Sequence, residues 1–518
     1  GVPALVKPSE YTCYLTEVVV RDIIASKILP EGSLQLICGL GRGILDHVDA
    51  RDIVTFTGSA STGKILKGLP RISQESVSFN LEADSLNATV LGKKATPGTV
   101  EFDLFIKETV KEITIKAGQK CTAVRRILVP EDLIDEVQSA ISARLASTKI
   151  GNPSEEGVRM GPLATTLQAE RVRASVEELS KSQRIVFGDL DHFDIIGDSA
   201  KREAFFSPIL FRNDDPFHQT ACHDIEAFGP VATIMPYKDL DDAIELAKMG
   251  KGSLVSSIVT PDNQEARDYV VGAASMHGRI LVLNEQCAKE STGHGSPLPL
   301  LVHGGPGRAG GGEEMGGLRG VKHYLQRTAI QGSPTTITAI TNVYQPNAKG
   351  KEPGKHPFKK YFEELEIGDQ IITEKRIITS EDIDRFADLS GDHFYAHIKT
   401  TDFSGTMFEQ QVAHGYLIMS IAAGLFVSSY EKNPVLLNYG IDELRFTKPV
   451  YPGAEVYIRF TCKEKLPNDK RIVENPADFK RGDDIEKGIV KWLVEFLDET
   501  DELTGVATIL TMVKKMKQ

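Results

Sequence analysis

Ala50–Ser59, ARDIVTFTGS, is a run of apolar and β-branched residues that ends in a glycine-containing turn, which is the pattern of a strand. Amphipathic helical patterns follow at 130–148, PEDLIDEVQSAISARLAST, and at 241–249, DDAIELAKM. Strands and helices alternate in this way over residues 1–330, as is typical of βαβ units around a mostly parallel sheet. We therefore expect an α/β fold for this part of the chain.

The composition changes farther along the chain. Residues 303–317, HGGPGRAGGGEEMGG, contain too much glycine for regular secondary structure. Residues 333–356 are rich in Thr, Asn, Pro, Gly and Lys, which indicates a linker. The sequence thus predicts a second domain over residues 357–518.

This second domain combines one long apolar segment with several strand-like runs. The apolar segment, AHGYLIMSIAAGLFVSSY at 413–430, is long enough for a buried helix. A strand is expected over 367–379, followed by a helix that has Ser380 as its N-cap. We expect one buried helix wrapped by an antiparallel sheet, which is an α+β domain.

The overall composition excludes several classes of protein. A chain of 518 residues with 41% hydrophobic and 25% charged residues is expected to be a soluble protein of two or three domains. The net charge of -12 counts against nucleic-acid binding, which needs a basic face. The apolar stretch 417–427 is too short to span a bilayer, and the first residues lack a signal-peptide pattern. Six cysteines at irregular spacing, without a CxxC pair, favour a reducing, cytoplasmic setting and no metal site.

One cysteine stands in a segment that suits a nucleophile. The stretch 115–129, IKAGQKCTAVRRILV, places Cys121 after a Gly-Gln-Lys turn and before a strand-like run. Nearby positive charge from Lys120, Arg125 and Arg126 would favour the reactive thiolate. A lone cysteine is also commonly a small buried apolar residue, so this segment alone leaves both interpretations open.

Five short motifs occur in the order that is found in the aldehyde dehydrogenase superfamily. They are KPSE at 7–10, FTGSASTG at 56–63, NLEADSLNATVL at 80–91, GQKC at 118–121 and EAFGPV at 226–231. Residues 1–332 therefore resemble this superfamily, with a Rossmann-like cofactor-binding part over about 1–80 and a catalytic part over about 81–300. The resemblance also implies an N-terminal part before Gly1, which the sequence given does not contain.

The resemblance implies roles in aldehyde oxidation. Cys121 would attack the aldehyde carbon, and Glu82 would be the general base that activates water to hydrolyse the thioester. The alternative for Glu82 is an ordinary salt-bridged carboxylate. Ala83 and Asp84 stand where the superfamily usually has two glycines, so the approach of the backbone to the nicotinamide would differ.

The same resemblance implies a dinucleotide site. Lys7 would hold the adenine ribose. Gly58, Ser59 and Gly63 would bind the pyrophosphate, and Glu226 and Phe228 would position the nicotinamide ribose and ring. Glu10 corresponds to a carboxylate that binds ribose hydroxyls and repels a 2′-phosphate, which favours NAD. Relatives with this architecture commonly use NADP, so the expected cofactor is NADP or NAD.

A second pair of polar residues lies in the C-terminal domain. The motif SGDHFYAH at 390–397 places Asp392 and His397 five residues apart, about 140° apart on a helical wheel. They converge on one water only if the chain leaves helical geometry, which Gly391 permits. The pair would then activate water. The alternative is a loop in which Asp392 caps a turn and His397 is solvated.

The order of the motifs in this domain decides between these alternatives. FEELEIGD at 362–369, SGDxxxxH, AHG at 413–415 and FTKPVYPG at 446–453 resemble the MaoC-like (R)-specific enoyl-CoA hydratases, which have the hot-dog fold. The resemblance covers about residues 357–518 and implies that Asp392 and His397 activate water. The Gly415 amide at a helix N-terminus would polarise the thioester carbonyl. His414 is expected either to line the same pocket or to be structural, and Phe394 and Tyr395 either to suit a bulky acyl group or to pack on the core.

The fusion itself predicts a two-step reaction. Water added to a cyclic enol ether gives a hemiacetal, which opens to an aldehyde that a dehydrogenase can oxidise. The architecture is similar to the bifunctional ring-opening enzymes of bacterial phenylacetate breakdown, which act on an oxepin-CoA. Alternatives are a fusion to a hydratase for linear enoyl-CoA, and a dehydrogenase-like module that serves only for oligomerisation. The expected partners are CoA-thioester and aldehyde substrates and further copies of the chain, with no nucleic acid and no membrane.

Overall fold

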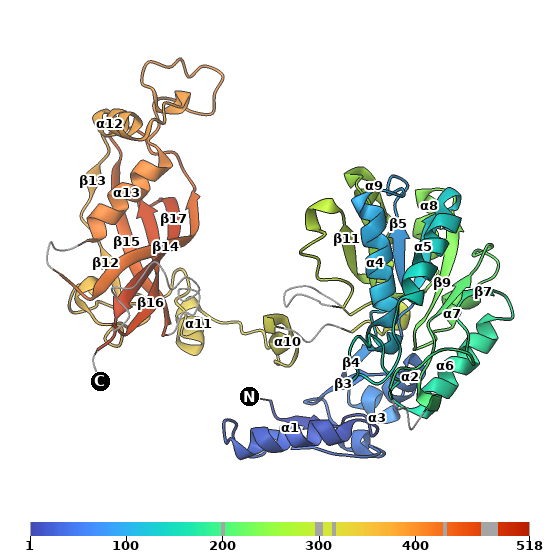
Figure 1. Ribbon diagram of the computed structural model, residues 1–518. Helices are drawn as coiled ribbons and strands as arrows, with labels where there is room; N and C mark the ends of the chain where they lie inside the picture. Colours follow the sequence, from blue (N-terminus) through green and yellow to red (C-terminus); the bar gives the residue numbers. More distant parts are fainter. Residues whose placement is uncertain are drawn as a thin grey trace. The chain divides into compact units, whose positions relative to one another are not determined.

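The chain divides into two compact units, Gly1–Gln326 and Arg327–Gln518. The computed structural model describes residues 2–197, 202–295, 304–312, 317–427, 432–467 and 485–516. Parts of two sequence predictions therefore lie outside the described residues, namely 303 and 313–316 of the glycine-rich passage and 428–430 of the apolar segment. Each unit is described by itself below (Figure 1).

The first unit is built around a seven-stranded sheet with the strand order β11-β10-β5-β6-β9-β8-β7. All neighbours are parallel except β7 and β8. The strands are β5 (Asn87–Leu91), β6 (Val124–Pro130), β7 (Arg184–Phe187), β8 (Ile209–Arg212), β9 (Val231–Tyr237), β10 (Ser253–Val259) and β11 (His277–Leu283). The predicted α/β fold with a mostly parallel sheet is confirmed for this unit.

Helices cover both faces of this sheet. Val90 and Leu91, neighbours on β5, belong to two different apolar clusters because successive side chains of a strand point to opposite faces. One cluster includes residues of α4 (Val100–Thr114) and α5 (Ile134–Ala146). The other includes residues of α6 (Thr166–Leu179), α8 (Leu240–Lys248) and α9 (Asn263–Ala273). Both expected helical patterns, 130–148 and 241–249, thus contain helices that bury one face on the sheet.

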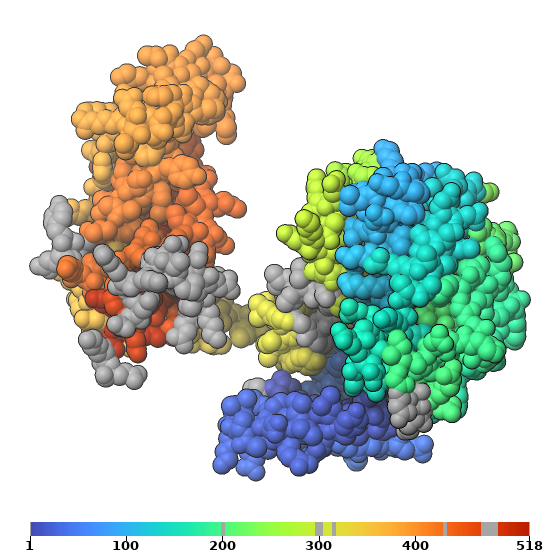
Figure 2. Space-filling view, in the orientation of Figure 1, coloured from blue at the N-terminus to red at the C-terminus, as the bar shows by residue number. Residues whose placement is uncertain are grey.

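The N-terminal residues form smaller parallel pairs. They are β1 (Ala4–Val6) with β2 (Leu34–Leu36), and β3 (Ile53–Thr57) with β4 (Ser78–Glu82), accompanied by α1 (Cys13–Ala25), α2 (Ala60–Lys67) and α3 (Pro70–Gln74). In the space-filling view these residues, in dark blue, gather at one side of the unit (Figure 2). The stretch ARDIVTFTGS is β3 followed by the turn into α2, as predicted. Short helices α7 (Ala221–Asp224) and α10 (Gly317–His323) complete the unit.

The second unit is an antiparallel sheet with one buried helix. Its strand order is β12-β15-β16-β17-β14, and β13 also pairs with β15. The strands are β12 (Gln370–Ile372), β13 (Arg376–Ile377), β14 (Val435–Phe446), β15 (Glu455–Leu466), β16 (Lys487–Leu497) and β17 (Leu503–Lys514). Helix α13 (Gly415–Phe426) shares an apolar cluster with β15, β16 and β17, in which the rings of Phe460 and Trp492 stack at 4.4 Å. The expected α+β domain with a single buried helix is confirmed.

Two local predictions in this unit are corrected. The expected strand 367–379 is divided into β12 and β13. Ile372 pairs with Arg459 and Arg376 pairs with Val456, so the segment between β12 and β13 has one residue more than the facing segment of β15. This extra residue forms a bulge that interrupts the strand. Helix α12 (Ser380–Ser390) has Thr379 as its N-cap, one residue before the predicted Ser380. Thr379 and Asp382 form a capping box, which uses both side chains at this helix start.

The segment 333–356, predicted to be a linker, is packed on the second unit. It contains helix α11 (Pro334–Thr341), and the Tyr344 amide donates to the Lys463 carbonyl at 2.8 Å. Tyr344 and Ala348 are buried against Leu493. Composition alone did not reveal this, because a single buried tyrosine anchors an otherwise polar stretch. Among the described residues no helix combines the length and apolar character that a membrane span requires.

Candidate active sites

The first unit brings Cys121 and Glu82 together. Glu82 is the last residue of β4, and Cys121 lies in the loop that leads into β6. The Cys121 thiol hydrogen-bonds to the Glu82 carboxylate; burial, and then the charge and hydrogen bond of Glu82, raise the pKa of Cys121 to about 11. The thiol is therefore protonated at neutral pH, and the group positioned to accept its proton is the adjacent carboxylate.

The loop that carries Cys121 is held from two sides. It follows a left-handed turn in which Lys116, Ala117 and Gly118 all have positive φ. A Cβ at Gly118 would overlap the Gly229 carbonyl, so the close approach of these two backbones requires glycine there. The buried Asn87 side chain donates to the carbonyls of Cys121 (2.8 Å) and Ala123 (2.9 Å).

The three cations near Cys121 in sequence bind other groups. Lys120 pairs with the buried Glu112 at 2.8 Å. Arg125 donates to the carbonyls of Gly118 and Gly229, and the buried Arg126 donates to three other main-chain carbonyls, those of Leu86, Leu246 and Ala247. Lys120 lowers the Cys121 pKa as expected, but burial and Glu82 outweigh this effect, and the net shift is upward.

Glu226 and Phe228 lie together around Arg125. The Arg125 guanidinium lies 5.6 Å from the centre of the Phe228 ring, and its Nε is 3.8 Å from Glu226 Oε1. Burial raises the pKa of Glu226 to about 7, although Arg125 opposes the shift. Glu226 Oε1 is buried and accepts no hydrogen bond from the described residues. A buried acceptor without a donor fits a ribose hydroxyl, which is what the superfamily resemblance implies at this position.

The turn into α2 has the close packing expected of a pyrophosphate turn. Ser59 is the N-cap of α2, and a Cβ at Gly58 or Gly63 would collide with the side chains of Phe56 or Leu81. Lys7 and Glu10 form an ion pair of 3.3 Å with each other at the turn before α1.

Asp84 departs from the superfamily pattern at this turn. Its Oδ1 accepts from the Ala60 amide at 2.5 Å, and its Oδ2 lies 3.5 Å from Arg308. A carboxylate thus already occupies one amide at the start of α2. A pyrophosphate there would share the first turn of α2 with Asp84, or displace it.

The glycine-rich passage holds the backbone on both sides of Glu82. The Gly312 amide donates to the Leu81 carbonyl at 3.1 Å, and the Ala83 amide donates to the Ala309 carbonyl at 2.9 Å. A Cβ at Gly310 would overlap the Leu81 carbonyl oxygen. The sequence showed the density of glycines in this passage and their incompatibility with regular structure, but not that the passage packs against the strand that carries Glu82.

The second unit brings Asp392 and His397 together as the motif predicts. Gly391, with φ of 77°, ends α12, and the chain then turns through Asp392 into a short helical turn, Tyr395–His397. His397 Nδ1 lies 2.7 Å from the Val412 carbonyl oxygen. A carbonyl only accepts, so Nδ1 carries the hydrogen and Nε2 is left with the lone pair of a base.

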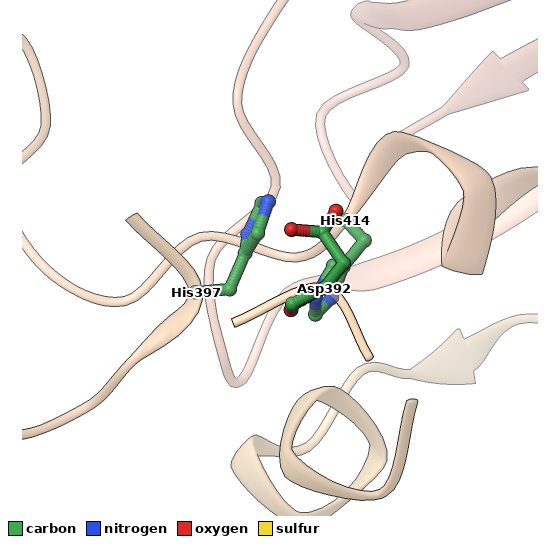
Figure 3. A group of neighbouring side chains, drawn as sticks. All are labelled: Asp392, His397 and His414. Carbon is green, nitrogen blue, oxygen red and sulfur yellow. Dashed lines mark hydrogen bonds between the residues drawn. The ribbon is translucent and has the colours of Figure 1, made fainter. Parts of the chain in front are cut away.

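A third residue, His414, completes this group (Figure 3). One polar atom from each of Asp392, His397 and His414 lies within 4.8 Å of the others, and the two imidazole rings stack at 3.7 Å with planes 25° apart. Stacked rings project their lone pairs in nearly parallel planes, whereas the ligands of a metal converge on one point. The arrangement suits acid–base chemistry better than metal binding.

The start of α13 lies beside this group. Gly415 is its first residue, and no side chain caps the helix. A Cβ at Gly415 would overlap the ring of Phe446, so glycine is required there. Phe394 and Tyr395 are exposed and contact each other at 4.5 Å between ring centres, so they do not pack in the core.

Comparisons with known proteins agree with both units. Residues 1–330 match the aldehyde dehydrogenase family, and residues 363–478 match the MaoC like domain. The chain therefore belongs to the aldehyde dehydrogenase family and carries a MaoC-like domain fused after it.

Individual relatives match about three fifths of the chain. The protein MaoC of Klebsiella aerogenes is 48% identical over 319 residues, which are 61% of this chain and 93% of that protein. The 3,4-dehydroadipyl-CoA semialdehyde dehydrogenase of Aromatoleum evansii is 42% identical over 306 residues, 59% of each chain. A crystal structure of betaine aldehyde dehydrogenase from Staphylococcus aureus, in complex with NAD+, has the same fold, with a TM-score of 0.55 and 24% identity over 63% of this chain and 62% of that one. The match thus spans about three fifths of these two dehydrogenases.

Proposed function

We propose that the chain is part of a bifunctional enzyme that opens a ring-derived CoA thioester of the oxepin-CoA type and oxidises the resulting semialdehyde to the acid, as in phenylacetate catabolism. The observation that carries the proposal is the presence, in one chain, of a thiol–carboxylate pair and of an aspartate–histidine pair beside an uncapped helix start. The relative from Aromatoleum evansii supports it, since its name, 3,4-dehydroadipyl-CoA semialdehyde dehydrogenase, describes a semialdehyde that is a CoA thioester.

The ring-opening step begins at His397. Its free Nε2 takes a proton from a water that the Asp392 carboxylate orients, and the water oxygen adds to the ring carbon that bears the ether oxygen. The Gly415 amide, at the positive end of α13, stabilises the negative charge that develops on the thioester oxygen. His397 returns the proton, and the resulting hemiacetal opens by cleavage of its ring carbon–oxygen bond to give an aldehyde.

The oxidation step uses Cys121 and Glu82. As the Cys121 sulfur adds to the aldehyde carbon, its proton passes to Glu82. A nicotinamide cofactor, NAD or NADP, would supply the hydride acceptor when bound, and loss of the hydride from that carbon leaves a thioester on Cys121. Glu82 gives its first proton to solvent and then takes a proton from the water that attacks the thioester. The acid is released, and this proton returns to the Cys121 sulfur.

We assign cofactor binding to residues that the superfamily resemblance selects and that fit the group. The buried Oε1 of Glu226, which accepts no hydrogen bond from the described residues, would accept one from the nicotinamide ribose, and Phe228 would face the nicotinamide ring. The tight turn at Gly58, Ser59 and Gly63 would receive the pyrophosphate.

The experiment that tests the proposal compares two CoA thioesters with the full-length enzyme. A cyclic enol-ether CoA and crotonyl-CoA are each incubated without cofactor, with NAD and with NADP, and the products are identified by mass spectrometry. We expect the cyclic substrate to gain one water without cofactor, and one further oxygen atom when the dinucleotide is present. Hydration of crotonyl-CoA alone, with the cyclic substrate unchanged, would overturn the ring-opening assignment.

A further inference from the structure

His414 occupies the N-cap position of α13 without capping the helix. A residue at this position usually accepts a hydrogen bond from the second or third amide of its own helix, as Thr379 does at α12. Among the described residues, no side chain caps the first amides of α13, although the helix is twelve residues long and six of its residues are buried.

The His414 side chain reaches the Asp392 segment instead. Its Nε2 lies 2.9 Å from the Asp392 carbonyl oxygen, so Nε2 carries the hydrogen and donates it. The side chain is 1% exposed, and its Nδ1 is buried without a hydrogen-bond partner among the described residues. Burial lowers the pKa of His414, which disfavours the charged form of the ring.

The ring of His414 is also held between two others. His397 stacks on it at 3.7 Å between ring centres, and Phe386 of α12 contacts it at 5.1 Å between ring centres. One buried residue thus joins the end of α12, the Asp392 turn, the His397 ring and the start of α13. Without His414, only local turn contacts would hold the exposed Asp392. One of them is the hydrogen bond that the Phe394 amide donates to the Asp392 carboxylate, at 3.2 Å.

We propose that His414 is a positioning residue for the hydration reaction: its Nε2–H fixes the Asp392 main chain, its ring supports His397, and it leaves the α13 amides free for the acyl oxygen. The inference rests on the proposed function of the Asp392–His397 pair. A displacement of about 1 Å in a catalytic group costs on the order of a hundredfold in rate, so a residue that sets two such groups has a measurable effect without touching substrate.

Two substitutions separate the donor of His414 from its ring. His414→Gln keeps an N–H near the position of Nε2 but removes the ring, and His414→Phe keeps a flat ring but removes the donor. We expect His414→Phe to lower kcat for hydration by about ten- to a hundredfold with KM nearly unchanged. His414→Gln should restore kcat to within about threefold of the parent, because the bond to the Asp392 carbonyl is the contact that sets the geometry. His393→Gln, at an exposed neighbouring histidine, is the matched control and should behave as the parent.

The outcomes distinguish this inference from the proposed function. Parent-like hydration by Asp392→Asn would overturn the proposed function itself. If Asp392→Asn loses hydration but His414→Phe has a normal kcat, only the role of His414 is overturned. The same conclusion follows if His414→Gln and His414→Phe are both folded and equally impaired. If His414→Phe does not fold by circular dichroism, His414→Met takes its place, since a flexible apolar side chain fills the same space without a donor.

Discussion

The two sites differ in how the chain brings their groups together. Cys121 and Glu82 come from a loop before β6 and from the end of β4, and they meet only because distant segments pack together. Asp392 and His397 lie five residues apart on one bent loop. The exposed Asp392 is held in position by its neighbours in sequence and by the buried His414. The first site is therefore vulnerable to changes far away in sequence, and the second to changes within its own loop and at His414.

The two sites also differ in how their reactive groups are held. Burial and Glu82 hold the Cys121 thiol in its protonated form, with a pKa of about 11, so the thiol must lose a proton before or during attack. In His397 the hydrogen bond from Nδ1 to the Val412 carbonyl selects the neutral tautomer in which Nε2 is the acceptor. Variants of the two sites test this comparison directly.

The largest effect is expected from Cys121→Ala. Removal of the nucleophile should abolish aldehyde oxidation, by at least about ten-thousand-fold, since no other group supplies the covalent step. Hydration should continue at the parent rate, because the Asp392–His397 pair lies in the other unit. NAD(P)H formation from a supplied aldehyde and mass spectrometry of the hydration product measure the two activities. The control is Cys287→Ser, which changes another half-buried cysteine of the first unit. Oxidation at the parent rate in Cys121→Ala would show that the nucleophile is a different residue.

Asp392→Asn should reverse the pattern. Loss of the charge that orients the water should slow ring opening by about a hundred- to ten-thousand-fold. Coupled formation of NAD(P)H from the CoA thioester should fall equally, while direct oxidation of a supplied aldehyde continues. Asp388→Asn, at an exposed position on α12, should leave both activities unchanged. If the coupled reaction is undiminished in Asp392→Asn, the hydration reaction takes place at a different site from this loop.

Sequence patterns predicted the parts of each site that depend on local structure. The stretch ARDIVTFTGS predicted β3 and its turn, and Gly391 predicted the point at which the chain leaves helical geometry before Asp392. Both predictions rest on the conformational preferences of a few adjacent residues, which tertiary packing did not override.

The parts that the sequence did not predict depend on long-range contacts. Arg126 is close to Cys121 in sequence, yet it points to the opposite side of its strand, away from its neighbour Arg125, and binds carbonyls of other segments. The packing of the glycine-rich passage on β4 and the role of Tyr344 in residues 333–356 arise between segments far apart along the chain. No local pattern encodes which backbone a glycine will approach.

Gly310→Ala tests the long-range support of the first site. An alanine there would press its Cβ on the Leu81 carbonyl and shift the backbone of the adjacent Glu82, so aldehyde oxidation should fall by about ten- to a hundredfold. Gly311→Ala is a matched control, because Gly311 also has positive φ but has no atom within 4 Å of an added Cβ. Both variants carry the backbone strain of alanine at positive φ, so their difference in kcat reports the contact alone. Equal kcat values in the two variants would mean that the passage does not position Glu82.

The smallest expected effect, and the sharpest test of the resting state, is the alkylation rate of Cys121 in Glu82→Gln. Removing the carboxylate removes a charge and a hydrogen bond that raise the thiol pKa, so the pKa should fall from about 11 toward its ordinary value of 9.0. Burial, the larger cause, persists, and the fall should be at most about one unit. Below the pKa the thiolate fraction rises tenfold for each unit of decrease, so reaction with iodoacetamide at pH 8 should accelerate by up to about tenfold.

Turnover should change in the opposite direction in the same variant, because Glu82→Gln also removes the group that accepts the proton during catalysis. Glu245→Gln, on the exposed surface of α8, is the control and should change neither rate. Because unfolding of the site would also expose the thiol and slow turnover, circular dichroism must first show that Glu82→Gln is folded. Labelling of the Cys121 peptide, followed by mass spectrometry over a range of pH, measures the shift. An alkylation rate that stays constant or falls would show that Glu82 does not hold the thiol in its protonated form.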